Sequence, residues 1–392
     1  MGGMQEHLDL TRAHGLALLA EIQDDLGRHY AAQRNTDRGA DGPATTSRLS
    51  PYLRRRLLLE QEVVAAAQAL HAEGAEKFVQ EVFWRTYFKG HLETRPWLWT
   101  QYRALAASGH ARLAAEPGLR AAYEQAITGR TGIDGFDDWA RELTEQNWLH
   151  NHVRMWFASI WIFTLGLPWA LGADFFMRHL IDGDPASNTL SWRWVAGLHT
   201  RGKHYVARAE NIARYTDGRY RPTNLNEVPE PLDEPEGPAP LPLPAAAAPP
   251  EGDVVLVLHL DDLHPESLDL GRVRVVGVRS VVAHADAAAA AVCLADRTAM
   301  DDALARATAH FGCPSYAGDG HFDGPSCAGE GTNQDLPALS AWAPVGPSAA
   351  AMPALHGIRR GWDSAVWPRS TRGFFKVKQA IPAVLQSVGI VG

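Results

Sequence analysis

A proline-rich stretch divides this sequence into two parts of different character. Residues 222–252 read PTNLNEVPEPLDEPEGPAPLPLPAAAAPPEG, with prolines throughout and repeated acidic residues. Proline restricts the backbone and like charges repel, so such a segment is typical of a semi-rigid, extended linker. The 392 residues also exceed the length of most single domains. We therefore expect two domains joined by this linker.

The residue pattern changes from helical to β-type across the linker. Apolar residues before it recur at helical spacing, as in LTRAHGLALLAEIQDDLGRHYAAQR, and no convincing strand precedes residue 222. After it, DVVLVLHL and RVRVVGVRSVV are short β-branched runs typical of strands. We expect a mainly α protein, with a helical domain at residues 1–221, the linker at 222–252 and a small α/β domain at 253–392.

Finer expectations concern the second domain. TAMDDALARATAHFG predicts a helix with Thr298 as its N-cap and Gly312 just past its end. Residues 313–350 are rich in Gly, Pro, Ser and Ala and predict irregular structure. The cysteines Cys293, Cys313 and Cys327 form no CxxC motif, so we interpret them as free thiols in a reducing compartment.

Charge and hydropathy bear on partners and location. The first 221 residues carry 26 basic and 25 acidic residues, whereas residues 222–392 carry 11 and 20. Residues 193–221 contain seven basic and two acidic residues. This excess of positive charge is compatible with phosphate contacts and equally with a solvated helix surface. The apolar stretch from Trp156 to Phe176 contains Ser, Thr, Pro and Gly and predicts a buried helix pair. With no signal peptide evident, we expect a cytoplasmic protein that avoids membranes, with a monomer favoured.

Four stretches place chemically active residues at regular spacing. Glu81, Trp84 and Arg85 lie at i, i+3 and i+4 and share one helix face. Trp148, Asn151 and Met155 share another, with Arg154 at its edge. TSRLSPYL at residues 46–53 offers hydroxyls and backbone N–H groups to an anion, or forms a simple N-cap turn. LIDGDPASNTLSWRW at residues 180–194 holds two aspartates, an amide and two tryptophans.

Taken together, the order and spacing of these stretches resemble the helical FAD-binding domain of the photolyase/cryptochrome family. The resemblance spans roughly residues 30–221 and implies an all-helical domain with FAD as cofactor. It implies that the phosphates and ribityl chain are held by Tyr30, Thr46, Ser47, Arg48, Leu49 and Ser50. It further implies an ion pair of Arg154 with Asp182 beside the isoalloxazine, Asp184 near its pyrimidine ring and Asn188 facing N5.

The resemblance also implies an enzyme, a deoxyribodipyrimidine photolyase that acts on damaged DNA. Trp84 and Trp194 correspond to residues that stack on flipped bases, and Glu81 and Asn151 to residues that hydrogen-bond the dimer. Met155 corresponds to the residue on the cyclobutane side, which favours cyclobutane pyrimidine dimers because a histidine is common there in the (6-4) branch. Trp192 and Trp169 resemble the first two steps of electron supply; the third step is open among Trp139, Trp156 and Trp161.

The sequence also departs from the family pattern. The antenna domain that family members usually carry before the flavin domain is absent from that place, and the α/β unit after the linker shows no chromophore signature, so the antenna stays unknown. Phe78 replaces a common pocket tryptophan, Thr86 a usual acid, and His152 an expected basic residue. A cryptochrome-like photoreceptor, a (6-4) photolyase and a degenerate flavoprotein remain the alternatives.

Overall fold

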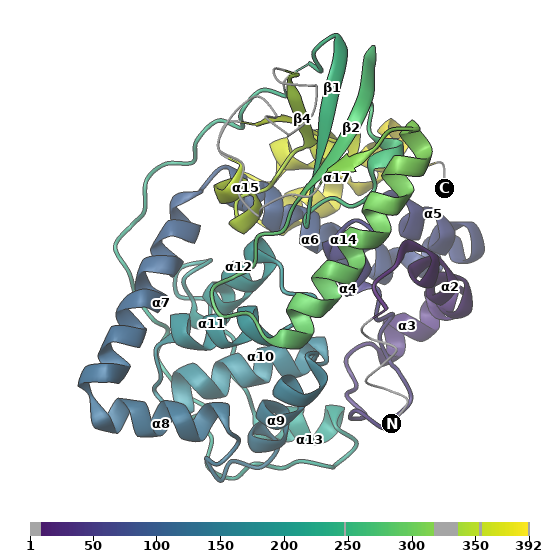
Figure 1. Ribbon diagram of the computed structural model, residues 1–392. Helices are drawn as coiled ribbons and strands as arrows, with labels where there is room; N and C mark the ends of the chain where they lie inside the picture. Colours follow the sequence, from purple (N-terminus) through teal and green to yellow (C-terminus); the bar gives the residue numbers. More distant parts are fainter. Residues whose placement is uncertain (1–8, 247, 317–335, 353–354, 391–392) are drawn as a thin grey trace. The chain divides into compact units, whose positions relative to one another are not determined.

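The computed structural model describes residues 9–246, 248–316, 336–352 and 355–390 (Figure 1). The chain forms two compact units, each discontinuous in sequence. Unit 1 comprises Met1–Gly27, Leu49–Thr94 and Pro240–Gly392; unit 2 comprises Arg28–Arg48 and Arg95–Ala239. Each unit therefore gathers segments that are distant along the chain, and each is described here by itself.

Unit 2 consists of helices around an aromatic core. Its helices are α3 (Arg28–Gln33), α7 (Trp97–Ala115), α8 (Pro117–Ile127), α9 (Phe136–Gln146), α10 (Asn151–Ser159), α11 (Trp169–His179), α12 (Pro185–Ala196) and α13 (Ala209–Tyr215). A π-helical turn, η3 (Ile160–Thr164), extends α10. The expected helix pair within the apolar stretch is confirmed by α10 and α11, and their apolar faces are buried. None of the helices in the described residues combines the length and apolar character that crossing a bilayer requires.

Unit 1 combines early helices with a parallel sheet. The early elements are α2 (Arg12–Ile22), η1 (Gln23–Asp25), α4 (Ser50–Arg54), α5 (Glu60–His71), η2 (Ala72–Ala75) and α6 (Glu76–Glu93). Among residues 9–221 there is no strand, as predicted. The later elements are β1 (Gly252–His259), η4 (Pro265–Ser267), β2 (Val273–Val281), α14 (Ala290–Phe311), β3 (Ser315–Tyr316), β4 (Ala338–Ala341), α15 (Pro347–Ala351), β5 (His356–Ile358), α16 (Gly361–Val366), η5 (Trp367–Arg369) and α17 (Phe374–Ser387).

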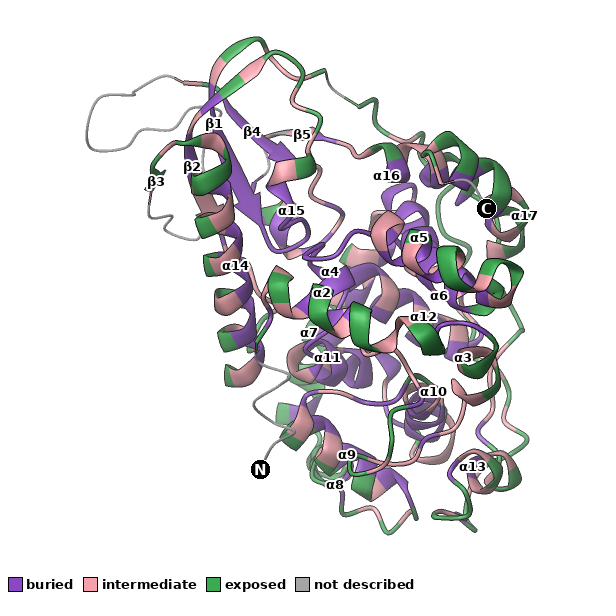
Figure 2. Cartoon of the chain, turned by 90° about the vertical axis from the view of Figure 1, so that its right-hand side faces the viewer, coloured by how far each residue is buried: buried purple, intermediate pink, exposed green. Residues whose placement is uncertain are grey.

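The five strands pair in parallel in the order β3-β2-β1-β4-β5. The central strand β1 is buried from Val254 onward, which explains its continuous apolar sequence (Figure 2). Helix α14 packs along β2 and β1. The two strands expected from DVVLVLHL and RVRVVGVRSVV are therefore confirmed as β1 and β2.

Two finer expectations for this region are wrong. Helix α14 begins at Ala290, and Thr298 lies inside it with Oγ1 donating to the Leu294 carbonyl at 3.1 Å. The alanine-rich residues before Thr298 are strong helix formers and extend the helix toward its N-terminus. Gly312 does end the helix, in the left-handed conformation. Residues 313–350 contain β3, β4 and α15, and residues 317–335 with Cys327 lie outside the described part; Cys293 and Cys313 are free thiols.

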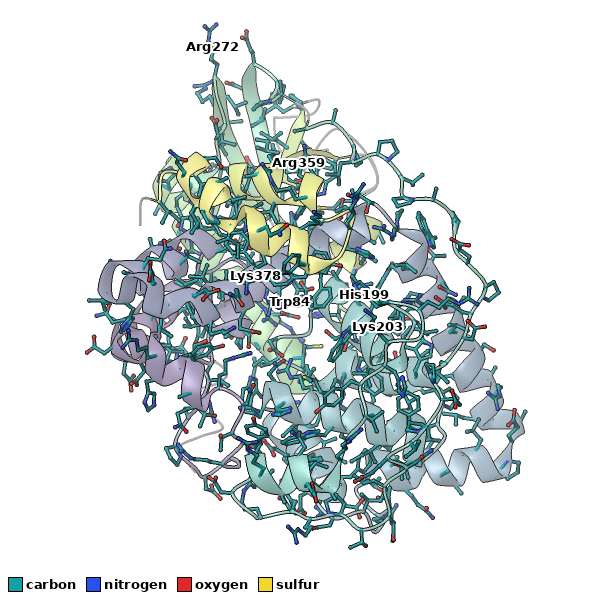
Figure 3. All side chains as sticks on the ribbon, turned by 180° about the vertical axis from the view of Figure 1, so that it is seen from behind. Trp84, His199, Lys203, Arg272, Arg359 and Lys378 are labelled. Atoms are coloured by element: carbon teal, nitrogen blue, oxygen red, sulfur yellow. The ribbon has the colours of Figure 1, made fainter. Side chains whose placement is uncertain are left out.

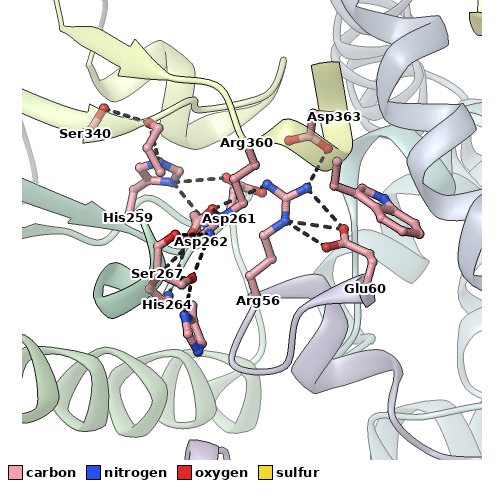
Figure 4. Close-up of polar contacts among 12 residues, drawn as sticks. Arg56, Glu60, His259, Asp261, Asp262, His264, Ser267, Ser340, Arg360 and Asp363 are labelled. Carbon is pink, nitrogen blue, oxygen red and sulfur yellow. Dashed lines mark hydrogen bonds and ion pairs between the residues drawn. The ribbon is translucent and has the colours of Figure 1, made fainter. Parts of the chain in front are cut away.

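Three consecutive arginines connect the early helices of unit 1 to its later residues, and Figure 4 shows the contacts of the third, Arg56. Arg54 donates to Asp261 at 2.8 Å, and Arg55 pairs with Asp296 at 2.5 Å. Arg56 is 2% exposed and pairs with three carboxylates, those of Glu60 (3.1 Å), Asp262 (3.4 Å) and Asp363 (2.6 Å). A buried charge is costly unless it is paired, so these contacts make residues 49–94 and 253–363 parts of one folded unit.

The proline-rich segment has no helix or strand among the described residues 222–251, and it is held at several points. Within unit 2, Glu234 pairs with Arg193 and accepts a hydrogen bond from Gln101. Within unit 1, the Leu241 N–H donates to the Thr94 carbonyl at 2.8 Å. Glu234 and Leu241 thus hold this segment to folded residues of their own units.

Candidate functional site

An ion pair between α10 and the residues before α12 forms the centre of the candidate site in unit 2. Arg154 Nη2 lies 3.0 Å from Asp182, whose side chain is 3% exposed, and Arg154 Nε donates to the Leu149 carbonyl at 3.0 Å. The second hydrogen bond fixes the guanidinium while leaving it 22% exposed. The predicted pair of Arg154 with Asp182 is thus formed, with a buried acid and a partly accessible cation.

Asp184 begins α12 and orients the residues that follow. Its carboxylate accepts from the Ser187 N–H at 2.7 Å, which makes it the N-cap, and Pro185 takes the first helical position. Asn188 lies one turn later, buried, with Nδ2 donating to the Ala173 carbonyl at 2.8 Å. That bond uses the amide nitrogen of Asn188, so its amide oxygen is the group of this side chain that can accept a hydrogen bond.

The hydroxyl-rich turn ends at a strained residue. Arg48 has a φ of 52°, in the left-handed region, and its guanidinium lies 4.9 Å from the centroid of Trp148. Tyr30 is half-buried on α3, and Thr46 and Ser47 are half-buried in the turn before Arg48. These four residues belong to unit 2, whereas Leu49 and Ser50 begin the next segment of unit 1.

His150 shows the electrostatic character of this region. The pKa of His150 is lowered to about 4, mainly by burial and also by the positive charges of Arg154 and Arg48, against the raising effect of Asp37. Its Nε2 contacts Thr45 Oγ1 at 3.3 Å. His150 is therefore neutral at neutral pH, and the local excess of arginine favours an anionic ligand.

The residues assigned to lesion contact in unit 2 lie on or beside α10 and α12. Asn151 is exposed at the first turn of α10, and Met155 is half-buried one turn later. Trp194 stacks on Tyr205, with centroids 5.6 Å apart and ring planes at 26°. His152 stacks on Trp156 at 4.2 Å and approaches the Tyr205 hydroxyl at 3.4 Å. His152 therefore supports the residues around Trp194, and burial lowers the pKa of its imidazole.

The tryptophans assigned to electron supply lie in the core of unit 2. Trp192 is 2% exposed and contacts Trp161 edge-on, with centroids 6.3 Å apart. Gly172 makes room for it, because a Cβ there would lie 2.3 Å from the Trp192 ring. The ring centroid of Trp169 lies 5.9 Å from that of Tyr102, and the ring centroid of Tyr102 lies 5.3 Å from that of Trp99. Trp139 and Trp156 stack on each other at 5.6 Å, separately from these contacts.

Glu81 and Trp84 belong to unit 1, on α6. Glu81, Trp84 and Arg85 are all half-buried, which agrees with their expected common face. The Trp84 ring stacks on Phe374 of α17, with centroids 3.7 Å apart and planes at 13°. Glu81 and Trp84 therefore belong to unit 1, whereas Asn151, Met155 and Trp194, which the resemblance also assigns to lesion contact, belong to unit 2.

Two residues near Trp84 had no sequence signal. Phe374 lies 290 positions after Trp84, in a segment with no motif. Trp362 donates through Nε1 to Thr86 Oγ1 at 2.9 Å, and both side chains are buried. The second contact explains the departure at Thr86: the hydroxyl serves the C-terminal part of unit 1. Phe78, the other departure on α6, is buried at 2% exposure.

Part of the chain is similar to known proteins. Residues 78–220 match the family model described as the FAD binding domain of DNA photolyase. Over this region the chain is similar to the photolyase/cryptochrome family. The expected cofactor, FAD, is confirmed at the level of that family model, and the expected mainly helical photolyase-like fold with a small parallel sheet is confirmed in its broad form.

Curated family members are similar over part of their length. The deoxyribodipyrimidine photo-lyase of Streptomyces griseus is 33% identical over 43% of this chain and 38% of its own length. That of Escherichia coli is 29% identical over 51% of this chain and 42% of its own. A crystal structure of a class III photolyase from Agrobacterium tumefaciens superposes at a TM-score of 0.39 with 21% identity, covering 52% of this chain and 44% of that one. The chain thus spans about two fifths of the length of these curated relatives.

The family's cofactor fits the polar residues present in unit 2. Ser187 Oγ and Trp192 Nε1 are buried and have no hydrogen-bond partner among the residues that the structure describes. Buried polar atoms in folded proteins are nearly always paired, so a polar ligand beside α12 would complete this region. Together with the Arg154–Asp182 pair and the hydroxyl-rich turn that contains Arg48, these atoms suit a cofactor that carries both a polar ring system and phosphates.

Proposed function

We propose that this chain is a photolyase that uses FAD to repair cyclobutane pyrimidine dimers in DNA. The observation that carries the proposal is the Arg154–Asp182 ion pair, formed inside the region that matches the photolyase FAD-binding model. The pair joins a buried carboxylate, at 3% exposure, to a guanidinium at 22% exposure, and a buried charge is stabilised by such a partner.

In this proposal, the flavin is held by residues of the turn and of α10 and α12. Arg48 and the hydroxyls beside it bind the phosphates, because they combine a cation with short hydroxyl donors. Arg154 and Asp182 orient the ring system, Asp184 binds its polar edge, and Asn188 presents its amide oxygen. Reduced FAD, when bound and excited by light, supplies the electron for repair. The protein positions the FAD and excludes water.

The lesion would be held by aromatic and polar residues. Base flipping is the general route by which enzymes, photolyases among them, reach a base inside a duplex. Trp84 and Trp194 provide stacking surfaces for the flipped bases. Glu81 and Asn151 provide hydrogen bonds to their polar edges, and Met155 packs on the apolar cyclobutane side. Trp192 and Trp169 would deliver electrons that keep the cofactor reduced.

The test is repair of a single cyclobutane thymine dimer in an oligonucleotide by the purified, chemically reduced protein, in blue light and in the dark. We expect light-dependent repair by the wild type. Glu81→Ala should abolish most repair and retain the flavin absorbance, whereas Glu76→Ala, an exposed acid on the same helix, should repair normally. If the wild type holds reduced FAD and repairs nothing, the proposal is wrong, and a (6-4) substrate or a photoreceptor role takes its place.

A further inference from the structure

Basic residues are segregated at the C-terminal end of unit 1. Residues 364–392 contain four basic residues, Arg369, Arg372, Lys376 and Lys378, and no acidic residue. The preceding residues 222–363 contain seven basic and 20 acidic residues. A short segment whose charged side chains are all positive, following a strongly acidic stretch, is a local surface suited to a polyanion.

These basic residues flank an exposed aromatic residue in the sequence. Arg369 ends η5, Arg372 follows it, and Lys376 lies in the first turn of α17; all three are exposed. Phe375, between them, is 65% exposed. Cations next to an accessible aromatic ring match the pattern by which proteins hold nucleic acid strands, with phosphates on the cations and a base or sugar on the ring.

The apolar face of α17 is already in use, which argues against a membrane as the partner. Val377, Ile381, Val384 and Leu385 are buried, and α17 packs on α6 and α16. An interfacial helix inserts such a face into lipid. Besides Lys376 and Phe375, the exposed residues of α17 are Gln379, Pro382, Ala383, Gln386 and Ser387, so the surface can contact a charged polymer but has no broad apolar stripe to insert.

This surface adjoins a residue of the proposed lesion site. Phe374, the neighbour of Phe375, stacks on Trp84 at 3.7 Å, and Lys378 Nζ lies 3.5 Å from Glu76 at the start of α6. Figure 3 shows Lys378 beside Trp84, whereas Arg272 lies at the distant tip of β1 and β2. A strand contacting the cations would therefore run next to the ring on which a flipped base is proposed to stack.

We propose that residues 369–378 bind the sugar-phosphate backbone of the DNA strand next to the damaged bases, with Arg369, Arg372 and Lys376 on phosphates and Phe375 on a sugar or base. Phe374 fixes the plane of Trp84 from the same segment. The inference rests on the proposed function for its choice of polymer. It assigns DNA contact to a segment that lies outside residues 78–220, the part matched by the family model.

The experiment compares two double variants of the full chain with equal loss of charge. Arg372→Ala/Lys376→Ala removes two cations of the proposed surface. Arg272→Ala/Arg274→Ala removes two exposed arginines, with side chains 86% and 74% exposed, at the far end of the sheet. Affinity for a fluorescent duplex, with and without one thymine dimer, is measured by anisotropy between 0.05 and 0.3 M salt, and flavin absorbance and Tm are recorded for each variant.

We expect the surface variant to lose about 1.8 from the slope of log affinity against log salt, or roughly 60-fold in affinity at 0.1 M, for both duplexes, since each phosphate contact contributes about 0.9. The control should match the wild type, and Phe375→Ala should weaken binding without changing the slope. Equal slopes for the two double variants would overturn the inference. So would loss of binding to anionic phospholipid vesicles with DNA binding unchanged. A wild type that binds DNA through this surface yet repairs no dimer would refute only the proposed function.

Discussion

Glu93 provides a pH-dependent test of the packing in unit 1. This carboxylate ends α6 at 7% exposure and accepts hydrogen bonds from the Val345 N–H at 2.7 Å and from Trp342 Nε1 at 3.1 Å. Burial raises the pKa of Glu93 from 4.5 to about 7; Asp363 raises it too, and the hydrogen bonds and Lys89 oppose the shift only in part. Between these values the folded protein keeps a proton that the unfolded chain has released.

The sign follows from proton linkage. The folded state binds more protons than the unfolded state between pH 4.5 and pH 7, so the stabilisation is complete below 4.5 and is lost as the pH rises through 7. A shift of that size corresponds to about 3 kcal/mol in total, of which about 2.5 kcal/mol lies between pH 5 and pH 8. Glu93→Gln should therefore unfold with a free energy that changes less across this range, by about 2–3 kcal/mol.

Urea unfolding at pH 5, 6, 7 and 8, followed by circular dichroism, measures this difference. Glutamine replaces one acceptor oxygen by a donor, so the variant also carries a constant cost of about 1–3 kcal/mol, and the slope with pH is the decisive quantity. Glu116→Gln, at an exposed carboxylate paired with Arg112, is the matched control and should run parallel to the wild type. Parallel curves for Glu93→Gln and the wild type would refute the reasoning.

Two further substitutions test the site and its support. Asp182→Asn should lower the flavin-to-protein absorbance ratio after purification and reduce the unfolding free energy by about 1.5–3 kcal/mol, because Arg154 loses a charged partner; an unchanged ratio would remove Asp182 from the cofactor site. Thr86→Val should cost about 1–3 kcal/mol by leaving the buried Trp362 N–H without its acceptor. When Thr86→Val is made in a Trp362→Phe background, it should cost much less than it does in the wild type. Simple additivity of the two changes would contradict the role given to this hydrogen bond.

The sequence was informative wherever the signal is local. The strands β1 and β2 follow from β-branched runs of a few residues. The pairing of Arg154 with Asp182 was implied by the resemblance of two short motifs to the photolyase/cryptochrome family. The roles of Glu81, Asn151 and Met155 at a lesion remain predictions.

What the sequence could not provide depends on segments that meet only after folding. Strand β4 is four residues long and lacks β-branched side chains, so its neighbours β1 and β5 define it more than its own composition does. The stacking of Phe374 on Trp84 joins positions 290 residues apart, and no periodicity in either segment reports such a meeting. The Thr86–Trp362 hydrogen bond is of the same kind.

The three arginines at the end of α4 have a consequence for synthesis. Arg56 and Asp363 lie 307 residues apart, so at 5–20 residues per second the ribosome needs about 15–60 s to supply the last carboxylate after the arginine has emerged. During that interval the early helices cannot bury Arg56 without leaving its charge incompletely paired. In a nascent chain that still lacks Asp363, residues around Arg56 are therefore expected to stay unfolded and accessible to chaperones and proteases until α16 leaves the ribosome.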